Sequence, residues 1–209
     1  MAVCRTAANA LAVMRSTPVD LAVIGLTLTD MDGLDLLSLM NEEGLARKIL
    51  VVTSRRDEWT RFHLRKTAIS GFLDVSEADE SDLEEALRCV MSGAVYHSPS
   101  WSRNQEVTSD EAETLVQILS VTELQVFSAI GDGSDDQKAA ERLGLSPKTV
   151  HSHRQRIMRK LGVQTRTELM REAIQRGLIR FTEDTVVRPV HERLMGERRL
   201  RNRIRSIRE

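Results

Sequence analysis

A change in hydrophobic periodicity near the middle of the chain constrains the fold more than any other feature of the sequence. Before it, the short apolar runs Leu21–Leu26, Ile49–Val52 and Gly71–Leu73 alternate with apolar residues at helical spacing. Continuous apolar runs of strand length are typical of parallel strands buried on both faces. After it, only helical spacing occurs. The sequence therefore predicts an α/β domain followed by an all-α domain.

The first half predicts a parallel sheet with crossover helices in the order βαβαβαβα. The clearest helix spans Leu83–Met91, where Leu83, Leu87, Val90 and Met91 recur at helical spacing. We expect this stripe to pack on the sheet, and a dimer surface is the alternative. The other expected elements are a strand at Ala2–Cys4 and helices at Ala7–Arg15, Leu34–Met40 and Asp57–Ala68.

Residues 98–118 lose this periodicity, and we interpret them as a linker between domains at 1–97 and 119–181. Beyond the linker, the helix caps are easy to identify. Ser120 with Glu123, and Thr165 with Glu168, have the spacing of capping boxes. Ser146-Pro147 places an N-cap before a proline at the first helical position. We expect helices at 121–130, 136–143, 147–161 and 166–176, and a basic tail at 182–209.

The helices at 136–143 and 147–161 have the spacing of a helix-turn-helix, with Gly144-Leu145-Ser146 as the turn. One face of the second helix, which we expect to be packed, carries Val150, His153, Ile157 and Leu161. The opposite face carries Lys148, Ser152, Gln155, Arg156 and Arg159, with His151 at its edge. From Lys148 to Lys160, both included, there are five Lys and Arg residues and no acidic one.

Such a face suits the major groove of double-stranded DNA, because Arg and Lys bind phosphates or guanine edges and Gln can form two hydrogen bonds with adenine. Taken alone, a basic face is more often solvated surface. The capped preceding helix, the short turn and the lack of acids within this helix favour DNA instead. The charge distribution agrees: residues 1–110 carry 11 basic and 17 acidic side chains, whereas residues 111–209 carry 19 and 14.

Many positions of the second half match one known family. They are Ser120 and Glu123, Gly133, Ala140 and Leu143, Ser146-Pro-Lys-Thr-Val150, His153, Ile157, Lys160-Leu-Gly-Val163, and Thr165-Arg-x-Glu168-Leu169. On these residues, Ser120–Phe181 resembles the LuxR-type helix-turn-helix of NarL/FixJ response regulators. The resemblance implies that His151, Ser152 and Gln155 face base edges, and that Thr149 and the flanking basic residues, Lys160 included, meet the DNA backbone. Two departures are Ala139, where a larger aliphatic residue is usual, and the acidic pair Asp135-Asp136.

The first half resembles the receiver domain of the same family, a flavodoxin-like parallel sheet. Pro18–Leu34 resembles its third strand and following loop. A working receiver needs an acidic pair for Mg²⁺, an aspartate that accepts the phosphoryl group, and a Thr/Ser and a Lys that bind the phosphate. Gly25 occupies the phosphoacceptor position and Val75 the lysine position, whereas Thr53 is retained. Because glycine has no nucleophile, we expect no aspartyl phosphorylation here.

The resemblance also implies that the sheet lacks its first strand and the acidic pair that follows it. In the family's strand order the absent strand is central, between Ala2–Cys4 and Leu21–Leu26. The N-terminal strand could close against its new neighbour, be displaced, or follow an upstream start. Asp30 and Asp32 are interpreted as loop residues. The acidic run Asp74–Glu85 is interpreted as a solvated face.

Other features of the sequence argue against a disulfide-linked, metal-binding, catalytic or membrane-spanning protein. Cys4 and Cys89 form no CxxC pair, so neither a disulfide framework nor a zinc site is expected. His153 is interpreted as a core residue rather than a metal ligand. No nucleophile–base pair or glycine-rich phosphate loop is recognisable. The longest uncharged run, Cys89–Ser102, has 14 residues, too few for a transmembrane helix. We expect a cytoplasmic protein that is not an enzyme and needs no metal, cofactor or membrane.

The tail His191–Glu209 carries seven Arg and three Glu, and could be an amphipathic helix that adds phosphate contacts or a disordered extension. Together these features predict a sequence-specific transcription regulator that binds DNA as a homodimer on two half-sites. It would be controlled by something other than aspartyl phosphorylation. The alternative is an interaction protein that heterodimerises with an intact response regulator and modulates it.

Overall fold

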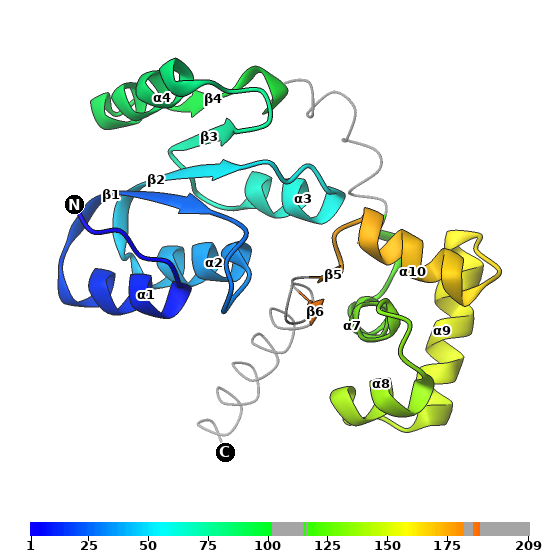
Figure 1. Cartoon of the computed structure of the whole chain (residues 1–209). Helices are drawn as coiled ribbons and strands as arrows, with labels where there is room; N and C mark the ends of the chain where they lie inside the picture. The colour runs from blue at the N-terminus through cyan, green and yellow to red at the C-terminus, as the bar shows by residue number, and fades with distance from the viewer. Residues whose placement is uncertain (102–114, 116, 182–185, 189–209) are drawn as a thin grey trace. The chain divides into compact units, whose positions relative to one another are not determined.

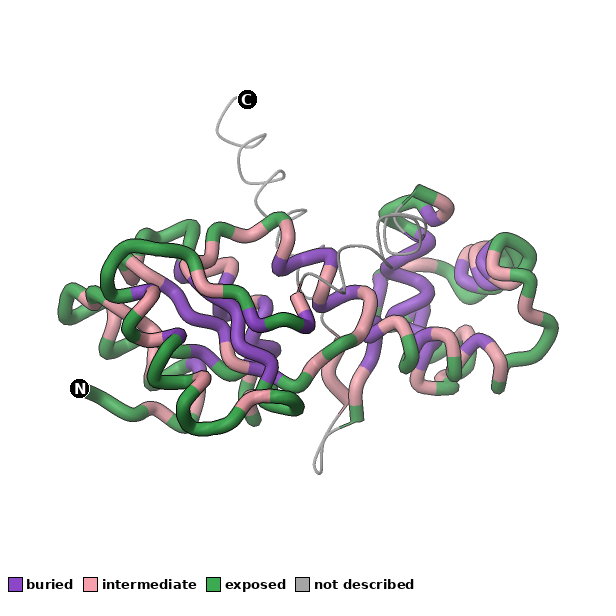
Figure 2. Tube along the Cα trace, turned by 90° about the horizontal axis from the view of Figure 1, so that it is seen from above, coloured by how far each residue is buried: buried purple, intermediate pink, exposed green. Residues whose placement is uncertain are grey.

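The computed structural model describes residues 1–101, 115, 117–181 and 186–188. They belong to two compact units, Met1–Ala112 and Glu113–Glu209, and the division lies within the segment 98–118 that the sequence indicates as a linker. The first unit is α/β and the second is almost entirely helical (Figure 1), as predicted. Figure 2 shows that each unit has buried segments of its own.

The N-terminal unit is built on a parallel sheet with the strand order β1-β2-β3-β4. The four helices predicted for this unit are all present. Helix α2 packs against α1, α3 and β1. The elements are α1 (Ala7–Ser16), β1 (Val19–Gly25), α2 (Gly33–Glu43), β2 (Ala46–Thr53), α3 (Glu58–Lys66), β3 (Gly71–Asp74), α4 (Glu80–Ser92) and β4 (Tyr96–His97).

Two details of the sheet differ from the prediction. The strand expected at Ala2–Cys4 is wrong: these residues are not in the sheet, and β1 pairs with β2 alone. Residues 2–4 have no neighbouring strand with which to form backbone hydrogen bonds, and Val3 is 83% exposed. Strand β4 was not expected, because Tyr96–His97 is too short to produce a hydrophobic period. The sheet therefore has four parallel strands among the described residues, with β1 at one edge and β4 at the other.

The apolar stripe of α4 packs on its own sheet through only part of its length. Ala86 and Val90 are fully buried against Leu50 and Leu73, and Leu87 is half-buried beside them. Leu83 and Met91, at the two ends of the stripe, are exposed. The expected packing on the sheet is thus confirmed for the middle of the helix.

The four helices predicted for the C-terminal unit agree with the structure to within one residue. Their core contains Phe127, Ile157, Leu169 and Leu178, which are at most 2% exposed. A short antiparallel pair, β5 (Arg180–Phe181) and β6 (Val186–Val187), follows them and was not predicted. Most of the predicted basic tail lies outside the described residues. The helices are α7 (Val121–Ile130), α8 (Asp136–Leu143), α9 (Pro147–Leu161) and α10 (Arg166–Gln175).

Candidate nucleic-acid interface

Local capping determines where α8 ends and where α9 begins. Gly144 ends α8 in the left-handed conformation, with φ of 65°, a region that residues with a Cβ rarely occupy. Two residues later, the hydroxyl of Ser146 accepts a hydrogen bond from the backbone N–H of Thr149, and Pro147 begins α9. The turn is therefore three residues long, as the sequence predicts for a helix-turn-helix.

Helix α9 has one buried face and one exposed face. Val150 and Ile157 are fully buried, whereas the opposite side is open to solvent. His153, expected on the packed face, is half-buried, and its Nδ1 is buried without a hydrogen-bond partner among the described residues. The structure brings together as exposed residues Lys148, His151, Ser152, Gln155, Arg156, Arg159 and Lys160, with Thr149 half-buried at the start of the helix.

These residues differ in whether their side chains form hydrogen bonds or ion pairs within the protein. The side chains of Lys148, Gln155, Arg156 and Arg159 have no hydrogen bond or ion pair with any other described residue. The hydroxyl of Thr149 lies 2.8 Å from that of Ser146, and the hydroxyl of Ser152 donates to the backbone carbonyl of Lys148. The four unbonded side chains are therefore the ones most available to a ligand.

Lys160 is also exposed on this face, but its Nζ bonds other parts of the domain. It donates to the carboxylate of Glu123 at 2.7 Å and to the backbone carbonyl of Ile118 at 2.8 Å. Burial by itself would raise the pKa of Glu123, but the hydrogen bonds from Lys160 and Ser120 outweigh it and hold that pKa below its ordinary value. Lys160 thus links α9 to the capping box of α7.

The structure also reveals a polar cluster that the sequence reasoning missed. Arg154 is buried, and its Nη2 lies 2.7 Å from Oδ2 of Asp136, at the start of α8. The same carboxylate oxygen lies 3.1 Å from Nδ1 of His151. At 100° per residue Arg154 falls about 40° from Val150, on the packed face, so the helical period could have indicated its burial. Its partner comes from another helix, which no local pattern indicates.

In the N-terminal unit, the residues at and after the carboxyl end of β1 are the ones that the resemblance to a receiver singles out. Gly25 ends β1, and a Cβ added there would find its nearest neighbour, the carbonyl of Val52, at 3.9 Å. Asp30 accepts hydrogen bonds from the backbone N–H groups of Ala7 and Ala8. Asp32 caps α2 by accepting a hydrogen bond from the backbone N–H of Leu34. Both of these loop aspartates are therefore bound to helix N-termini.

Arg55 and Arg56 bring positive charge to this edge of the sheet, and Nε of Arg56 lies 2.8 Å from Asp74 at the end of β3. Arg55 is the one beside β1. Its Nη1 donates to the buried carboxylate of Asp32 at 3.1 Å, and its Nε lies 3.4 Å from Asp57. The same Nη1 lies 3.4 Å from the carbonyl of Leu26. Among the described residues, no group of three or more His, Cys, Asp and Glu side chains is placed to hold a metal ion.

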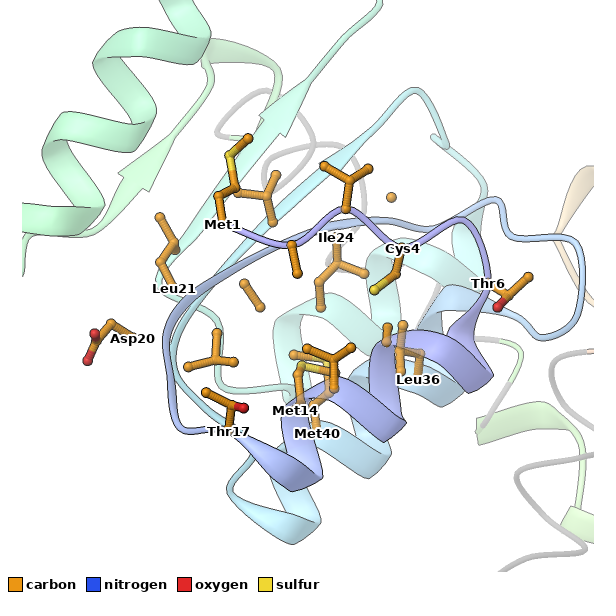
Figure 3. A pocket seen from close by; sticks show the side chains of 18 of the residues that line it. Met1, Cys4, Thr6, Met14, Thr17, Asp20, Leu21, Ile24, Leu36 and Met40 are labelled. Carbon is orange, nitrogen blue, oxygen red and sulfur yellow. The ribbon is translucent and has the colours of Figure 1, made fainter.

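The free edge of β1 borders a cavity of about 800 Å³ (Figure 3). The run that the sequence indicates as a strand buried on both faces is a sheet edge here, and Val23 is 52% exposed. Figure 3 shows apolar side chains from β1, α1 and α2 around the cavity, with Asp20 pointing away from it. The labelled apolar residues are Met1, Met14, Leu21, Ile24, Leu36 and Met40.

Comparison with known proteins agrees with this two-unit description. The family described as "Bacterial regulatory proteins, luxR family" matches residues 117–173. The oxygen regulatory protein NreC of Staphylococcus aureus (strain JH9) is 31% identical over 142 residues, which are 64% of this chain and 65% of NreC. NreC of strain USA300 matches equally well. The chain thus spans 65% of the length of these curated relatives.

Solved structures share the fold at lower sequence identity. A structure of the RcsB response regulator of Salmonella typhimurium has a TM-score of 0.54, with 20% identity over 82% of both chains. RcsB from Salmonella enterica serovar Typhimurium bound to promoter P1flhDC has a TM-score of 0.52, with 20% identity over 83% of both chains.

The fold, a parallel α/β sheet followed by a helix-turn-helix, is thus similar to that of the RcsB response regulator. Residues 117–173, which include α8 and α9 as the helix-turn-helix, match the luxR family of bacterial regulatory proteins. Among the described residues no helix has the length and hydropathy needed to cross a membrane.

Proposed function

We propose that the protein is a cytoplasmic, sequence-specific DNA-binding transcription regulator that acts as a homodimer. The exposed basic face of α9 is the observation that carries this proposal. An α-helix fits the major groove of B-DNA, where base edges present distinct donors and acceptors. The family match of the surrounding domain favours this use of the helix.

Individual residues on the face suit different parts of the DNA. Gln155 and His151 have side chains that can bond base edges, and Ser152 is small enough for close approach. Lys148, Thr149, Arg156 and Arg159 suit the phosphates, which position the protein without reading sequence. Lys160 would add less, because its ammonium group already bonds Glu123. RcsB structures include one bound to a promoter and one with two RcsB dimers on two parallel DNAs, which supports a dimer on two half-sites.

Control by aspartyl phosphorylation at the receiver position is not part of this proposal. Gly25 has no side chain to accept a phosphoryl group, and the nearby Asp30 and Asp32 are bound to helix N-termini. The signal would therefore be expression level, a partner protein or a ligand.

A salt titration of DNA binding tests the proposal. Arg159→Ala should weaken binding to all sequences and lower the slope of log affinity against log salt by about one, because one phosphate contact is lost. Arg88→Ala, which removes an exposed arginine from α4, is the matched control and should leave the slope unchanged. Absence of any salt-sensitive DNA binding by the wild-type protein would exclude the proposed function.

The free edge of β1 supports a second candidate, an interaction protein that heterodimerises with an intact response regulator and modulates it. Unpaired backbone groups along an apolar edge strand can bond an added strand. Val23→Lys places a charge on this edge and should abolish binding of a labelled intact regulator, whereas DNA affinity should not change. If no intact regulator binds the wild-type protein, this candidate is excluded.

A further inference from the structure

Beyond the helix-turn-helix, the chain is fixed to the turn between α7 and α8 by an ion pair. Arg188 follows β6, and its Nη2 pairs with Oδ2 of Asp132. The two side chains are 15% and 10% exposed. Nη1 of Arg142, in α8, lies 3.3 Å from the same carboxylate oxygen. Asp132 therefore holds the last described residue of the chain against the C-terminal unit.

The surroundings of Asp132 make it a firm anchor. Its Oδ1 accepts a hydrogen bond from the backbone N–H of Ser134 at 2.9 Å, which fixes the carboxylate within the turn. Burial by itself would raise the pKa of Asp132, but the hydrogen bonds from Ser134 and the charges of Arg188 and Arg142 hold that pKa below its ordinary value. The carboxylate is thus ionised at neutral pH, and its hydrogen bonds to the two guanidinium groups are charge-assisted.

The anchor is closely linked to the helix face that we propose contacts DNA. Asp132 precedes Asp136 by four residues, so their Cα atoms are at most about 14 Å apart. Asp136, at the start of α8, lies 3.1 Å from Nδ1 of His151 on the exposed face of α9. The point at which the chain leaves the described fold is therefore joined to that face through one turn and two side-chain contacts.

The sequence beyond this point is rich in arginine. Residues 189–209 include seven Arg and three Glu, and residues 198–208 contain six of these arginines and no acid. Nine residues separate Arg188 from Arg198, so the chain between them spans at most about 36 Å, and one turn of B-DNA is about 34 Å long. A guanidinium group binds phosphate through two parallel hydrogen bonds. Residues 198–208 thus have the charge and the reach to bind duplex beyond the site of α9.

We propose that residues 198–208 bind phosphates of the duplex next to the sequence contacted by α9, from an exit point fixed by the ion pair between Arg188 and Asp132. This inference rests on the proposed DNA binding and extends it beyond the helix-turn-helix. Contacts to phosphates read no sequence. The segment therefore strengthens binding to specific and unrelated DNA alike, and its contribution declines as salt rises.

The first test removes three charges of this segment from the full-length protein. A variant that combines Arg201→Gln, Arg203→Gln and Arg205→Gln should lower the slope of log affinity against log salt by about 2 to 3, because each phosphate contact contributes about 0.9. An unchanged slope would overturn the inference. Tighter DNA binding by this variant would also overturn it, because the segment would then compete with DNA.

The matched control removes three exposed arginines of the N-terminal unit, by combining Arg5→Gln, Arg47→Gln and Arg88→Gln. It changes the net charge equally and should leave the slope as it is in the wild-type protein. Equal decreases in the two variants would overturn the inference, because net charge alone would then explain both. If the wild-type protein shows no salt-sensitive DNA binding, the proposed function fails and this inference fails with it. If only the segment variant behaves like the wild-type protein, the inference fails alone.

Hydroxyl-radical footprints then locate the contacts on the DNA backbone. The wild-type protein should protect sugars next to the central site, and the segment variant should lose this flanking protection while the central site stays protected. Arg188→Gln keeps all seven arginines of residues 189–209 but breaks the anchor. It should keep the salt slope and spread the flanking protection over more positions. A footprint of Arg188→Gln identical to that of the wild-type protein would overturn the anchoring role of the ion pair.

Discussion

Gln155 lies on the exposed face of α9, and its side chain has no hydrogen bond with any described residue, so its side-chain amide is available to a base edge. Gln155→Ala should lower affinity for the specific operator by about 1–3 kcal/mol, the usual value of a bidentate contact. Affinity for unrelated DNA should change little. Gln175→Ala, an exposed glutamine at the end of α10, is the control. Equal losses on both kinds of DNA would contradict a base contact by Gln155.

The lowered pKa of Glu123 leads us to expect that replacing this residue changes stability in a pH-dependent way. Its folded pKa lies below its ordinary value of 4.5, so its charge stabilises the fold fully above that value, and the stabilisation is lost as pH falls through the folded pKa. Glu123→Gln keeps the capping geometry but removes the ion pair with Lys160. The variant should be about 1 kcal/mol less stable at pH 7.

Thermal unfolding of the wild-type protein and Glu123→Gln at pH 7 and at pH 3 checks this expectation. The difference between their melting temperatures should be smaller at pH 3 than at pH 7, because the stabilisation that comes with a lowered pKa declines once the pH falls below the ordinary value. Gln164→Ala, an exposed change near the end of α9, should give no such pH-dependent difference. A gap between Glu123→Gln and the wild-type protein that is equally large at both pH values would contradict the ion-pair explanation.

At the scale of elements, two glycines near the end of β1 should respond very differently to an added methyl group. At Gly33 a Cβ would lie 2.4 Å from Cα of Leu26 and 2.8 Å from the carbonyl of Gly25, both of which are backbone atoms. Gly33→Ala should cost about 3 kcal/mol of unfolding free energy because backbone must move. Gly25→Ala should change stability by less than about 0.5 kcal/mol. Denaturant unfolding measures the loss of unfolding free energy in both variants. Similar losses in the two would contradict the predicted difference.

The helices could be predicted from the sequence more accurately than the sheet, for a local physical reason. A capping box such as Ser120 with Glu123 satisfies backbone groups within four residues, so its pattern lies in the sequence itself. A strand depends on a neighbour that is distant in the chain. Ala2–Cys4 therefore looks like a strand but has no partner, whereas Tyr96–His97 pairs with β3 despite its short length.

The candidate site likewise has one part that follows from local sequence and another that depends on contacts between helices. The exposed face of α9 follows from a helical period of 3.6 residues, and the sequence was sufficient to place Gln155, Arg156 and Arg159 together. The pairing of Arg154 with Asp136, and of Lys160 with Glu123, joins different helices. Such contacts depend on how helices pack, and a basic residue gives no sign in the sequence of whether it will meet DNA or a carboxylate.

At the scale of the whole molecule, the two units predict a regulator that does not respond to phosphodonors. Treatment of the full chain with acetyl phosphate and Mg²⁺ should add no phosphoryl group near Gly25 and should leave the DNA-binding isotherm unchanged. Intact-mass measurement with peptide mapping checks the first expectation, and the isotherm checks the second. An intact response regulator that is labelled under the same conditions is the control. Stoichiometric labelling of this protein would overturn its proposed independence of phosphorylation.

The guanidinium of Arg55, enclosed by two carboxylates beside the end of β1, bears on how the chain could regain such a response. A carboxylate introduced at Gly25 would be adjacent in sequence to Leu26, whose carbonyl already accepts from Arg55. The cation at this edge of the sheet would then be a tethered guanidinium, which cannot exchange ligands or carry water as a hydrated metal ion does. Replacing Gly25 by aspartate alone would thus restore a carboxylate without restoring the metal ion that phosphoryl transfer to it needs.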